Sequence, residues 1–388
     1  MIEGEPCGPK YQKGVFHQMK IVCYNQELIK GVNTVLKAVP VRTTMPILEC
    51  ILIEAENGQI SLTANNMELG ISTVISGDIV TPGTIAIDAK MFSEMVKKLP
   101  DNDVTIEAND SNYEVTIQCE EAFFRVRGKD GDEFTKLPSI DRDQYFTINQ
   151  FDLKQVINQT IFSIATNENN KIMCGELFEV NGNNLRVTSL DGYRISIRNV
   201  ELKDDYGKFK KIVPGKTLSE ISKILTGEAD SEVLVYVTNN HILFEFDDTV
   251  VVSRLIEGEY FHVEQMLTGD YATKVTINKR KLMSCFDRAT LFIRESDKKP
   301  IIIDISDEGI DLKLVSNMGS FEEHAVAEKT GKDLTIGFNP RFFMDILKVI
   351  DEEDINIYMM NSKAPCFIKD AEATYTYLLI PVSFSVPE

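Results

Sequence analysis

The 388-residue sequence lacks the spaced residue patterns that mark the common catalytic and metal-binding sites. None of its four histidines belongs to a His-Glu-x-x-His pair, and no Gly-x-Ser-x-Gly segment is present. The Gly-Lys-Thr sequence at 215–217 resembles the end of a Walker A loop, but that motif requires glycine where this chain has Lys210. The acidic run at 130–133 lacks the spaced ligands of a calcium loop and is typical of a solvated turn. We therefore expect a protein that is not an enzyme and that uses no cofactor.

The sequence also lacks an apolar run of 18 residues, a signal-peptide pattern at its start and any Cys-x-x-Cys pair. Its seven cysteines are scattered and odd in number, which favours reduced thiols. Residues 1–18 are polar and show no pattern, so we expect an N-terminal extension that is disordered or an addition before Met19. These absences predict a cytoplasmic protein with no membrane partner.

What the sequence does contain is a repeat. A strand-like run gives way to a short amphipathic helix pattern six times, at intervals of 61 to 65 residues. In the first helix pattern Leu28, Val32 and Val35 lie on one face of a 3.6-residue period. Asn or Asp just before such a run suits an N-cap, because its side chain accepts hydrogen bonds from free backbone N–H groups. The expected helix starts are Asn25, Asp88, Asn149, Pro214, Asn278 and Asn339.

Alternating stretches rich in Val, Ile and Thr lie between the helices, such as 114–118 and 233–238, and are typical of antiparallel strands. Turns at Gly58, Gly182 and Gly309 recur after 124 and 127 residues, which is the shorter period doubled. We therefore expect an α+β fold of three similar domains, each built from two units. The expected domain boundaries are 19–143, 144–268 and 269–388.

Positive charge is scarce overall but is not evenly distributed. The chain has 41 Lys and Arg against 60 Asp and Glu, a net charge of −19, which argues against a nucleic-acid partner. The six helix segments, however, hold 14 basic residues against 8 acidic ones, which leaves 27 against 52 elsewhere. One interpretation is that helices simply tolerate lysine well. The recurrence favours the other, in which the helix faces receive a polyanion by sequence-blind contact.

Four segments carry a resemblance to a known family: Thr-Ser-Leu-Asp-Gly-Tyr-Arg-Ile at 188–195, and the segments at 42–48, 255–260 and 377–382. In order and spacing they resemble bacterial sliding clamps, the beta subunit of DNA polymerase III, from Met19 to about Phe384. The resemblance implies a DNA-clamp fold in which each domain holds two strand-helix-strand-strand-strand units. It also implies a ring-forming homodimer that encircles double-stranded DNA during replication as a processivity factor, associated with the nucleoid.

The resemblance further implies a hydrophobic pocket between the second and third domains for a short partner peptide. The implied partners are the DNA polymerase III alpha subunit, the clamp loader and other proteins with a clamp-binding motif. After Tyr260 the chain departs from the family, because Phe261, His262 and Val263 stand where proline and an acidic or amide residue are usual. The implied pocket residues are Met173, Leu190, Gly192, Tyr193, Arg194, Ile195, Phe261, Met266, Leu378, Leu379, Ile380, Pro381 and Val382.

DNA-facing side chains are expected on the basic helix segments and, by the resemblance, at Arg42. Those on the helices are Lys90, Lys97, Lys154, Lys216, Lys223, Lys279, Arg280, Lys281, Arg341 and Lys348. The resemblance places the dimer interface at Met95, Phe124, Val126, Leu291 and Phe292.

Other functions fit the same repeat. A cytosolic repeat scaffold that binds only proteins would use the same period and the same apolar C-terminal segment without touching DNA. An enzyme with a site assembled across domain junctions is disfavoured, because no spaced catalytic constellation is present.

Overall fold

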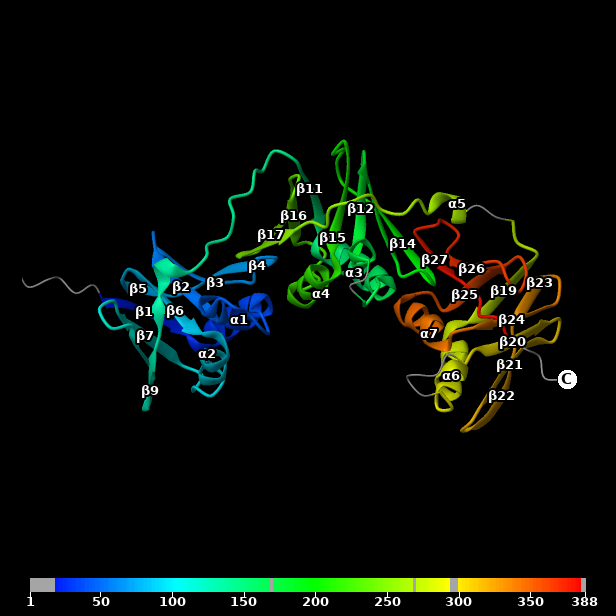
Figure 1. The fold of residues 1–388 in the computed structure, drawn as a ribbon, viewed down its shortest axis with the longest axis horizontal. Helices are drawn as coiled ribbons and strands as arrows, with labels where there is room; N and C mark the ends of the chain where they lie inside the picture. The colour runs from blue at the N-terminus through cyan, green and yellow to red at the C-terminus, as the bar shows by residue number, and fades with distance from the viewer. Residues whose placement is uncertain (1–17, 168–169, 268–269, 294–298, 385–388) are drawn as a thin grey trace, which may run out of the picture. The chain divides into compact units, whose positions relative to one another are not determined.

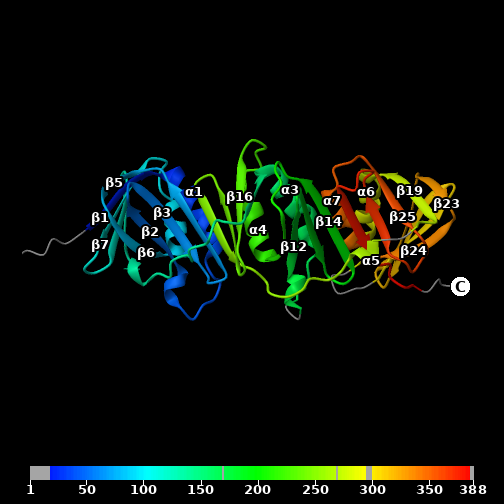
Figure 2. The same ribbon diagram turned by 90° about the horizontal axis from the view of Figure 1, so that it is seen from above.

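The computed structural model of the chain describes residues 18–167, 170–267, 270–293 and 299–384. The expected N-terminal extension, apart from Gln18, lies outside the described residues, as do the four residues after Phe384. The chain divides into two compact units, shown in Figures 1 and 2, and each is described by itself. They are Met1–Ser139 with Asp247–Val252, and Ile140–Phe246 with Ser253–Glu388.

The first unit combines the helices α1 (Asn25–Val35) and α2 (Ala89–Val96) with antiparallel strands. The strands are β1 (Gln18–Tyr24), β2 (Cys50–Glu56), β3 (Gln59–Asn65), β4 (Leu69–Ile75), β5 (Asp78–Thr81), β6 (Gly83–Asp88), β7 (Asp103–Asn109), β8 (Glu114–Cys119), β9 (Ala122–Arg127) and β10 (Lys129–Asp130). One sheet has the order β5-β1-β7-β8-β9, and in the other the strands of this unit follow the order β10-β6-β2-β3-β4. The strand β9 is an edge of the first sheet.

The second unit holds two further copies of this arrangement. Its helices are α3 (Gln150–Thr160), α4 (Gly215–Ile224), α5 (Glu264–Leu267), α6 (Lys279–Thr290) and α7 (Pro340–Val349). Its earlier strands are β11 (Tyr145–Asn149), β12 (Gly175–Asn181), β13 (Asn184–Leu190), β14 (Arg194–Glu201), β15 (Lys208–Pro214), β16 (Glu232–Val237) and β17 (His241–Phe246). The strand β18 (Thr249–Arg254) runs through the point where the chain passes from the first unit to the second.

The later strands of the second unit belong to two sheets. They are β19 (Thr273–Asn278), β20 (Ile301–Ser306), β21 (Gly309–Ser316), β22 (Gly319–Ala325), β23 (Glu328–Gly331), β24 (Leu334–Phe338), β25 (Asp354–Met359), β26 (Cys366–Lys369) and β27 (Tyr375–Leu379). The nine-stranded order is β15-β12-β13-β14-β27-β26-β25-β19-β23, and a four-stranded sheet has the order β22-β21-β20-β24. The pairing of β14 with β27, from Arg194 opposite Leu379 to Arg198 opposite Tyr375, therefore joins two copies of the repeat in one sheet.

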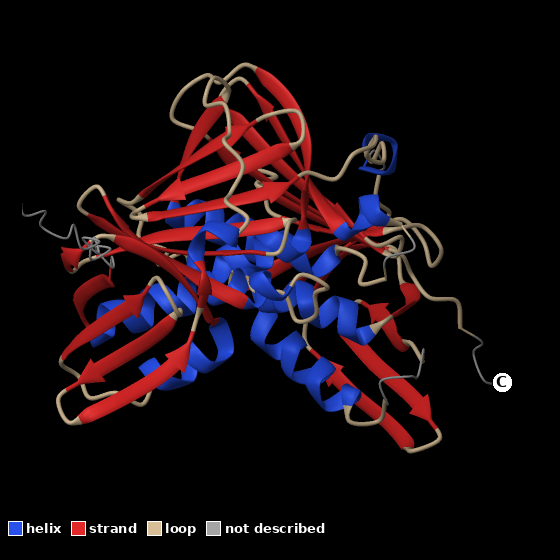
Figure 3. Ribbon diagram, turned by 60° about the vertical axis from the view of Figure 1, so that its left-hand side comes forward, coloured by secondary structure: helices blue, strands red, loops and turns tan. Residues whose placement is uncertain are grey.

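The helices pair as the repeat predicts. α1 packs against α2, α3 against α4, and α6 against α7, while α3 also lies on β14 and α7 on β27. Figure 3 shows the helices, in blue, lying against the red strands of the sheets. The face predicted for α1 is buried, with Leu28, Val32 and Val35 at most 1% exposed. Burial of one apolar stripe of each helix supplies much of the stabilisation that short helices lack by themselves.

Five of the six predicted helix starts are N-cap residues, and four of those five cap with their side chains. Asp88, Asn149, Asn278 and Asn339 accept a backbone N–H of the first turn, whereas Pro214 has no side-chain acceptor. The helix start predicted at Asn25 is confirmed, but the N-cap role expected there was wrong, because Tyr24 is the cap and Asn25 is the first helical residue.

A tertiary contact explains the shift at Asn25. Its Nδ2 donates to the carbonyls of Leu99 and Pro100 at 3.2 and 3.1 Å, so the side chain holds the end of the α2 segment instead of capping its own helix. The amide is only 2% exposed, and burial of this kind requires hydrogen-bond partners.

Candidate functional site

A row of apolar side chains crosses the nine-stranded sheet on the face opposite α3. The hydroxyl of Ser189 donates to Thr160 O at the end of α3 at 2.6 Å, so the next residue, Leu190, faces the other way. Leu190 pairs with Ile195, Ile195 with Leu378, and Leu378 with Phe367. Since directly opposite residues share a face, these four side chains form a continuous apolar row on the outer face of the sheet.

The row belongs to one buried cluster, which we call the outer-face cluster. Its buried members are Leu177, Leu190, Ile195, Ile197, Ile212, Tyr260, Val263 and Leu378, and the partly buried residues packed on it are Ile172, Met173, Ile256, Leu267 and Phe367. Four of the predicted pocket residues, Met173, Leu190, Ile195 and Leu378, are thus brought together. Leu379 instead lies in the core beneath the helices, because successive residues of a strand face opposite ways.

The turn between β13 and β14 presents Tyr193 to solvent. Asp191 Oδ1 accepts hydrogen bonds from the backbone N–H groups of Tyr193 and Arg194 at 2.9 and 3.1 Å, and Gly192 adopts a φ of 88°. Such a turn needs glycine at the left-handed position and a carboxylate or amide before it. The Tyr193 side chain is 58% exposed, with its ring centroid 6.0 Å from that of Phe342. The Asp191–Arg194 turn therefore holds the Tyr193 ring at the edge of the outer-face cluster.

Arg194 faces the helices and is fully engaged. Its Nε lies 3.0 Å from Asp191 Oδ2 and its Nη1 lies 2.7 Å from Asp345 Oδ2 of α7, while Nη2 donates to Phe162 O. The guanidinium also lies over the ring of Phe342, 4.3 Å from the centroid. The arginine side chain is only 9% exposed. Its role in this arrangement is to fix the Asp191–Arg194 turn against α7, rather than to offer a free cation to a ligand.

The chain after β27 continues along the edge of the site. Ile380 N donates to Tyr193 O at 2.9 Å and the Ile380 side chain is 44% exposed. Val382 N donates to Gly337 O of β24 at 2.8 Å, and a Cβ on Gly337 would lie 2.7 Å from the Phe384 ring. Pro381 and Val382 thus lie beside the four-stranded sheet, whereas Ile380 remains next to the Asp191–Arg194 turn.

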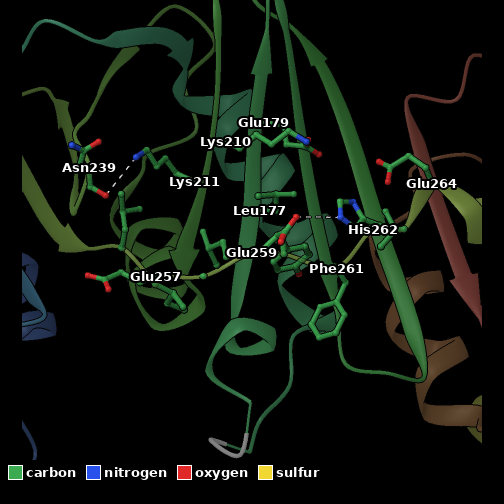
Figure 4. Close-up of a pocket in the computed structure, with 16 residues that line it drawn as sticks. Leu177, Glu179, Lys210, Lys211, Asn239, Glu257, Glu259, Phe261, His262 and Glu264 are labelled. Carbon is green, nitrogen blue, oxygen red and sulfur yellow. Dashed lines mark hydrogen bonds and ion pairs between the residues drawn. The ribbon is translucent and has the colours of Figure 1, made fainter.

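The linker at 255–264 crosses the outer face of β12 and β15 (Figure 4). Tyr260 and Val263 are buried in the outer-face cluster, and Tyr260 donates to Gly175 O at 3.3 Å. Phe261 is 41% exposed, and His262 faces solvent with Nε2 3.3 Å from Glu259 Oε1. The departure from the family pattern therefore places an aromatic ring and an imidazole on the solvent side of the linker, while the buried positions stay apolar.

A cavity of about 460 Å³ lies along this linker, with Leu177, Ile212 and Ile256 among its lining residues. Its rim carries charges of both signs, including Lys210 and Lys211 from β15 and Glu257 and Glu259 from the linker (Figure 4). Phe261 is the one predicted pocket residue that lines it. The outer-face cluster therefore lines this cavity and also lies beside the turn that carries Tyr193.

Comparison with known proteins identifies the family. Models of the DNA polymerase III beta subunit match the chain in order, the N-terminal domain at residues 19–138, the central domain at 147–262 and the C-terminal domain at 264–383. A crystal structure described as a DNA polymerase III beta subunit, from Eubacterium rectale, is 59% identical with a TM-score of 0.91, over 94% of this chain and 100% of that one. This chain belongs to the DNA polymerase III beta subunit family.

More distant clamps agree. The DNA polymerase sliding clamp from Bacillus subtilis is 30% identical with a TM-score of 0.91, over 95% of this chain and 100% of that one. The beta sliding clamp of Staphylococcus epidermidis is 28% identical over 375 residues, which are 94% of this chain and 99% of that protein. The predicted family, the clamp fold and the sliding-clamp function in DNA replication are confirmed.

The clamp repeat is not uniform at the site. β3 and β13 hold corresponding places in the repeat, as do β4 and β14, so Asn65 corresponds to Leu190 and Gly70 to Ile195. In the first unit Asn65 Nδ2 donates to Thr135 O at 3.1 Å, and a Cβ on Gly70 would lie 2.1 Å from the Leu137 side chain. The first copy of the repeat therefore has Asn65 and Gly70, which its own residues 135–137 cover, at the positions where the second copy has the apolar Leu190 and Ile195.

Several residues of the site escaped the sequence analysis. Leu177, Ile212, Tyr260 and Val263 form much of the cluster, while Phe342 and Asp345 hold Arg194. The adjacent phenylalanines at 342 and 343 could have indicated that α7 contributes to the site, because only one of two neighbouring helix residues can face the core. Phe343 is buried there, and Phe342 faces Arg194.

The predicted DNA-facing residues differ in how they are engaged. Lys154 Nζ donates to Leu225 O at 2.7 Å, and Lys279 Nζ donates to Ile350 O, so both ammonium groups cap the end of the neighbouring helix segment. Lys281 lies 3.1 Å from Glu323, and Lys223 lies 2.8 Å from Glu220. The side chains that are exposed are those of Arg42, Lys90, Lys97, Lys216, Lys223, Arg280, Lys281, Arg341 and Lys348.

Four of the five predicted interface residues lie on or near two edge strands. Phe124 and Val126 are half-buried on the edge strand β9. Leu291 is 72% exposed just after α6, and Phe292 lies next to Gly319 at the start of the edge strand β22. Met95 is only 8% exposed within the first unit. An apolar side chain as exposed as Leu291 is typical of an association surface when it lies beside an unpaired strand edge.

A buried carboxyl lies beneath the site. Glu176 of β12 is fully buried, and no hydrogen-bond partner within the described structure reaches either of its oxygens in good geometry. Burial raises the pKa of Glu176 well above its usual value, and the nearby Thr160 hydroxyl opposes this only in part. The carboxyl is therefore held in its neutral form, since an unpaired buried charge is far more expensive than a neutral acid.

Replacing Glu176 with glutamine should stabilise the clamp increasingly as the pH rises. Because the folded-state pKa exceeds the unfolded value of about 4.3, the folded chain binds more protons between the two, and the free energy of unfolding falls by about 1.4 kcal/mol per pH unit. The glutamine side chain would not titrate, so the gap between variant and parent should widen in urea unfolding from about pH 5 to pH 7. Glu179→Gln, on the opposite face of β12 beside Lys210, is the control. Parallel pH profiles for E176Q and the parent would contradict a neutral Glu176.

Two features are absent from the described residues. No helix within them is long and apolar enough to cross a membrane. No group of three or more His, Cys, Asp or Glu side chains in that part of the chain is arranged to hold a metal ion.

Proposed function

We propose that two copies of this clamp form a head-to-tail ring that encircles double-stranded DNA without reading its sequence. The observation that carries the proposal is the ordered match of all three clamp domains across residues 19–383. The proposed domains are 19–143, 144–268 and 269–388, each supplying two of the basic helix segments to the inner surface of the ring. Held by topology, the clamp needs only weak phosphate contacts, and sliding stays easy.

The proposed dimer joins edge β9 of one copy to edge β22 of the other. The two edges carry opposite charges, with Arg125 and Arg127 on β9 and Glu322 and Glu323 on β22. The Arg288 guanidinium holds the pKa of Glu323 at about 2, so this carboxylate stays ionised throughout the physiological range, paired with Arg288 and Lys281. Pairing of complementary edges satisfies backbone groups that are otherwise open and fixes the head-to-tail orientation. Phe124, Val126, Leu291 and Phe292 then supply its apolar contacts.

The proposed partner site is the outer-face cluster together with the Tyr193 ring. Apolar anchor residues of a partner peptide would insert beside Leu190, Ile195 and Leu378, with Met173, Met266 and Ile380 at the rim. The partners would be the DNA polymerase III alpha subunit, the clamp loader and other proteins with a clamp-binding motif. The clamp itself would be a non-catalytic processivity subunit, associated with the nucleoid in the cytoplasm.

Retention on circular DNA tests the ring. A clamp loaded on nicked plasmid by its clamp loader should stay bound through gel filtration at moderate salt and should be lost when the plasmid is linearised, because a ring slides off free ends. Light scattering on the free protein should give twice the monomer mass. Equal retention on linear and circular DNA would contradict topological binding, and a monomer that binds partner peptides but never DNA would favour the scaffold alternative.

A further inference from the structure

Two lysines and two tyrosines gather on the outer face of the nine-stranded sheet, on β19, β25, β26 and the residue stretch before β19. The rings of Tyr271 and Tyr358 meet edge to face with centroids 5.0 Å apart. Lys274 Nζ and Lys369 Nζ lie over the Tyr358 ring, 5.7 and 5.3 Å from its centroid. We call these four residues the Tyr358 cluster. The cation–π contacts keep both ammonium groups close to one ring.

The Tyr358 cluster continues the apolar row of the partner site. Leu378 pairs with Phe367, Phe367 with Tyr358, and Tyr358 with Lys274, each directly opposite the next on neighbouring strands. Directly opposite residues in adjacent antiparallel strands lie about 4.5–5.5 Å apart, so an extended segment can follow the row across them. Phe367 packs against the outer-face cluster and thus links the two sites.

The charge of the Tyr358 cluster is unusual for this clamp. Within the described residues no carboxylate lies in ion-pair distance of Lys274 or Lys369, whereas Lys329 of the neighbouring strand β23 has Asp307 and Asp333 as partners. The nearest acidic residues in sequence are Asp270, next to Tyr271, Glu328, opposite Thr276, and Asp370, next to Lys369. Asp370 is engaged elsewhere, because it accepts hydrogen bonds from Thr374 Oγ1 and Tyr375 N. In a chain of net charge −19, two uncompensated lysines on one ring form a local site for an anion.

We propose that the Tyr358 cluster binds acidic side chains of the partner peptide, directly beyond the residues anchored in the outer-face cluster. The inference rests on the proposed partner site and adds a charge preference to it. The apolar anchors would supply most of the affinity, and the lysines would select partners whose flanking segment carries Asp or Glu. Tyr358 holds the two ammonium groups at a fixed spacing, which reduces the entropy lost when a carboxylate binds.

Peptide binding separates this proposal from the partner site itself. The probe is the fluorescein-labelled clamp-binding peptide of the alpha subunit, made in two extended forms, one with two glutamates added at the N-terminus and one with two glutamates added at the C-terminus. Each form has a matched control in which glutamines replace the added glutamates. The form whose glutamates reach the Tyr358 cluster should bind about three- to tenfold more tightly than its glutamine control at low salt, as expected for two partly exposed ion pairs. The advantage should shrink at about 0.5 M salt because of screening.

Variants then assign the gain to the lysines. In the Lys274→Glu, Lys369→Glu double variant the glutamate advantage should disappear or reverse, while the unextended peptide binds as before. Lys203→Glu with Lys208→Glu, the same charge change near the opposite edge of the second unit's large sheet, should leave the advantage intact. Equal binding of glutamate and glutamine peptides, or an advantage that survives in the Lys274/Lys369 variant, overturns the proposal. Failure of the unextended peptide to bind would instead overturn the partner site.

Discussion

Replacing Arg194 with alanine is expected to lower the free energy of unfolding of the second unit by about 3 kcal/mol, because it leaves buried polar groups without a partner. The Asp191 side chain is 12% exposed and its Oδ2 loses the guanidinium, while Asp345 and the carbonyl of Phe162 lose their donors. The stacking of Arg194 on Phe342 is lost as well. Urea unfolding monitored by circular dichroism measures the change.

Arg186→Ala is the matched control for Arg194. It removes an arginine from the neighbouring strand β13, whose pair with Glu264 is long at 3.4 Å, with side chains 26% and 58% exposed. Such a pair contributes about 0.5 kcal/mol. A similar effect of both substitutions would show that Arg194 is not a structural anchor.

Peptide binding by the Arg194 variant should also fall, since the turn that carries Tyr193 is no longer fixed. Tyr193→Ala, at an exposed position, should weaken peptide binding without changing the unfolding transition. These two variants together distinguish a residue that positions the site from one that contacts the peptide.

Leu291→Asp is expected to convert the proposed dimer into monomers. The substitution removes an apolar contact from the interface and places an unpaired carboxylate there. Together these changes should weaken dimerisation by about 3 kcal/mol, which raises the Kd of the dimer roughly a hundredfold. Because Leu291 is 72% exposed in the single chain, the substitution should leave the fold unchanged. Light scattering across a dilution series gives the Kd, and retention on circular DNA should be lost in parallel.

Met360→Asp serves as the control for Leu291. Met360 is 41% exposed in the same unit but follows β25 of the nine-stranded sheet, outside the proposed interface, so its variant should stay dimeric and should remain on circular DNA. If L291D also remained a dimer at nanomolar concentration, the β9–β22 pairing would be excluded as the ring contact.

Much of this fold follows from local patterns. The helix period and the Asn and Asp caps predicted six helices, because each signal depends on residues within one turn. The N-cap rule did not hold at Asn25, because its side chain donates hydrogen bonds to residues 74 and 75 positions away. No local pattern encodes such a contact. The four-residue helix α5 was missed for the related reason that its Leu267 is ordered by packing on the outer-face cluster.

The proposed partner site was predictable only in part. The apolar segment at 377–382 indicated a site, but strand alternation sends Leu378 to the outer cluster and Leu379 to the core, a division that depends on the register of β27 against β14. Register across distant segments cannot be obtained from either segment alone. For the same reason the partners of Arg194 on α7 were found only in the structure, since 151 residues separate Arg194 from Asp345.

The pairing of β14 with β27 also has a consequence for synthesis on the ribosome. β14 is made before the entire third copy of the repeat, and β27 is the last strand of that copy. At about 5–20 residues per second, a nascent chain therefore exposes the bare edge of β14 and half of an apolar cluster for many seconds. We expect this edge to require chaperone protection during translation. A message truncated before Tyr375 would yield a protein that cannot compete with intact clamps for the polymerase.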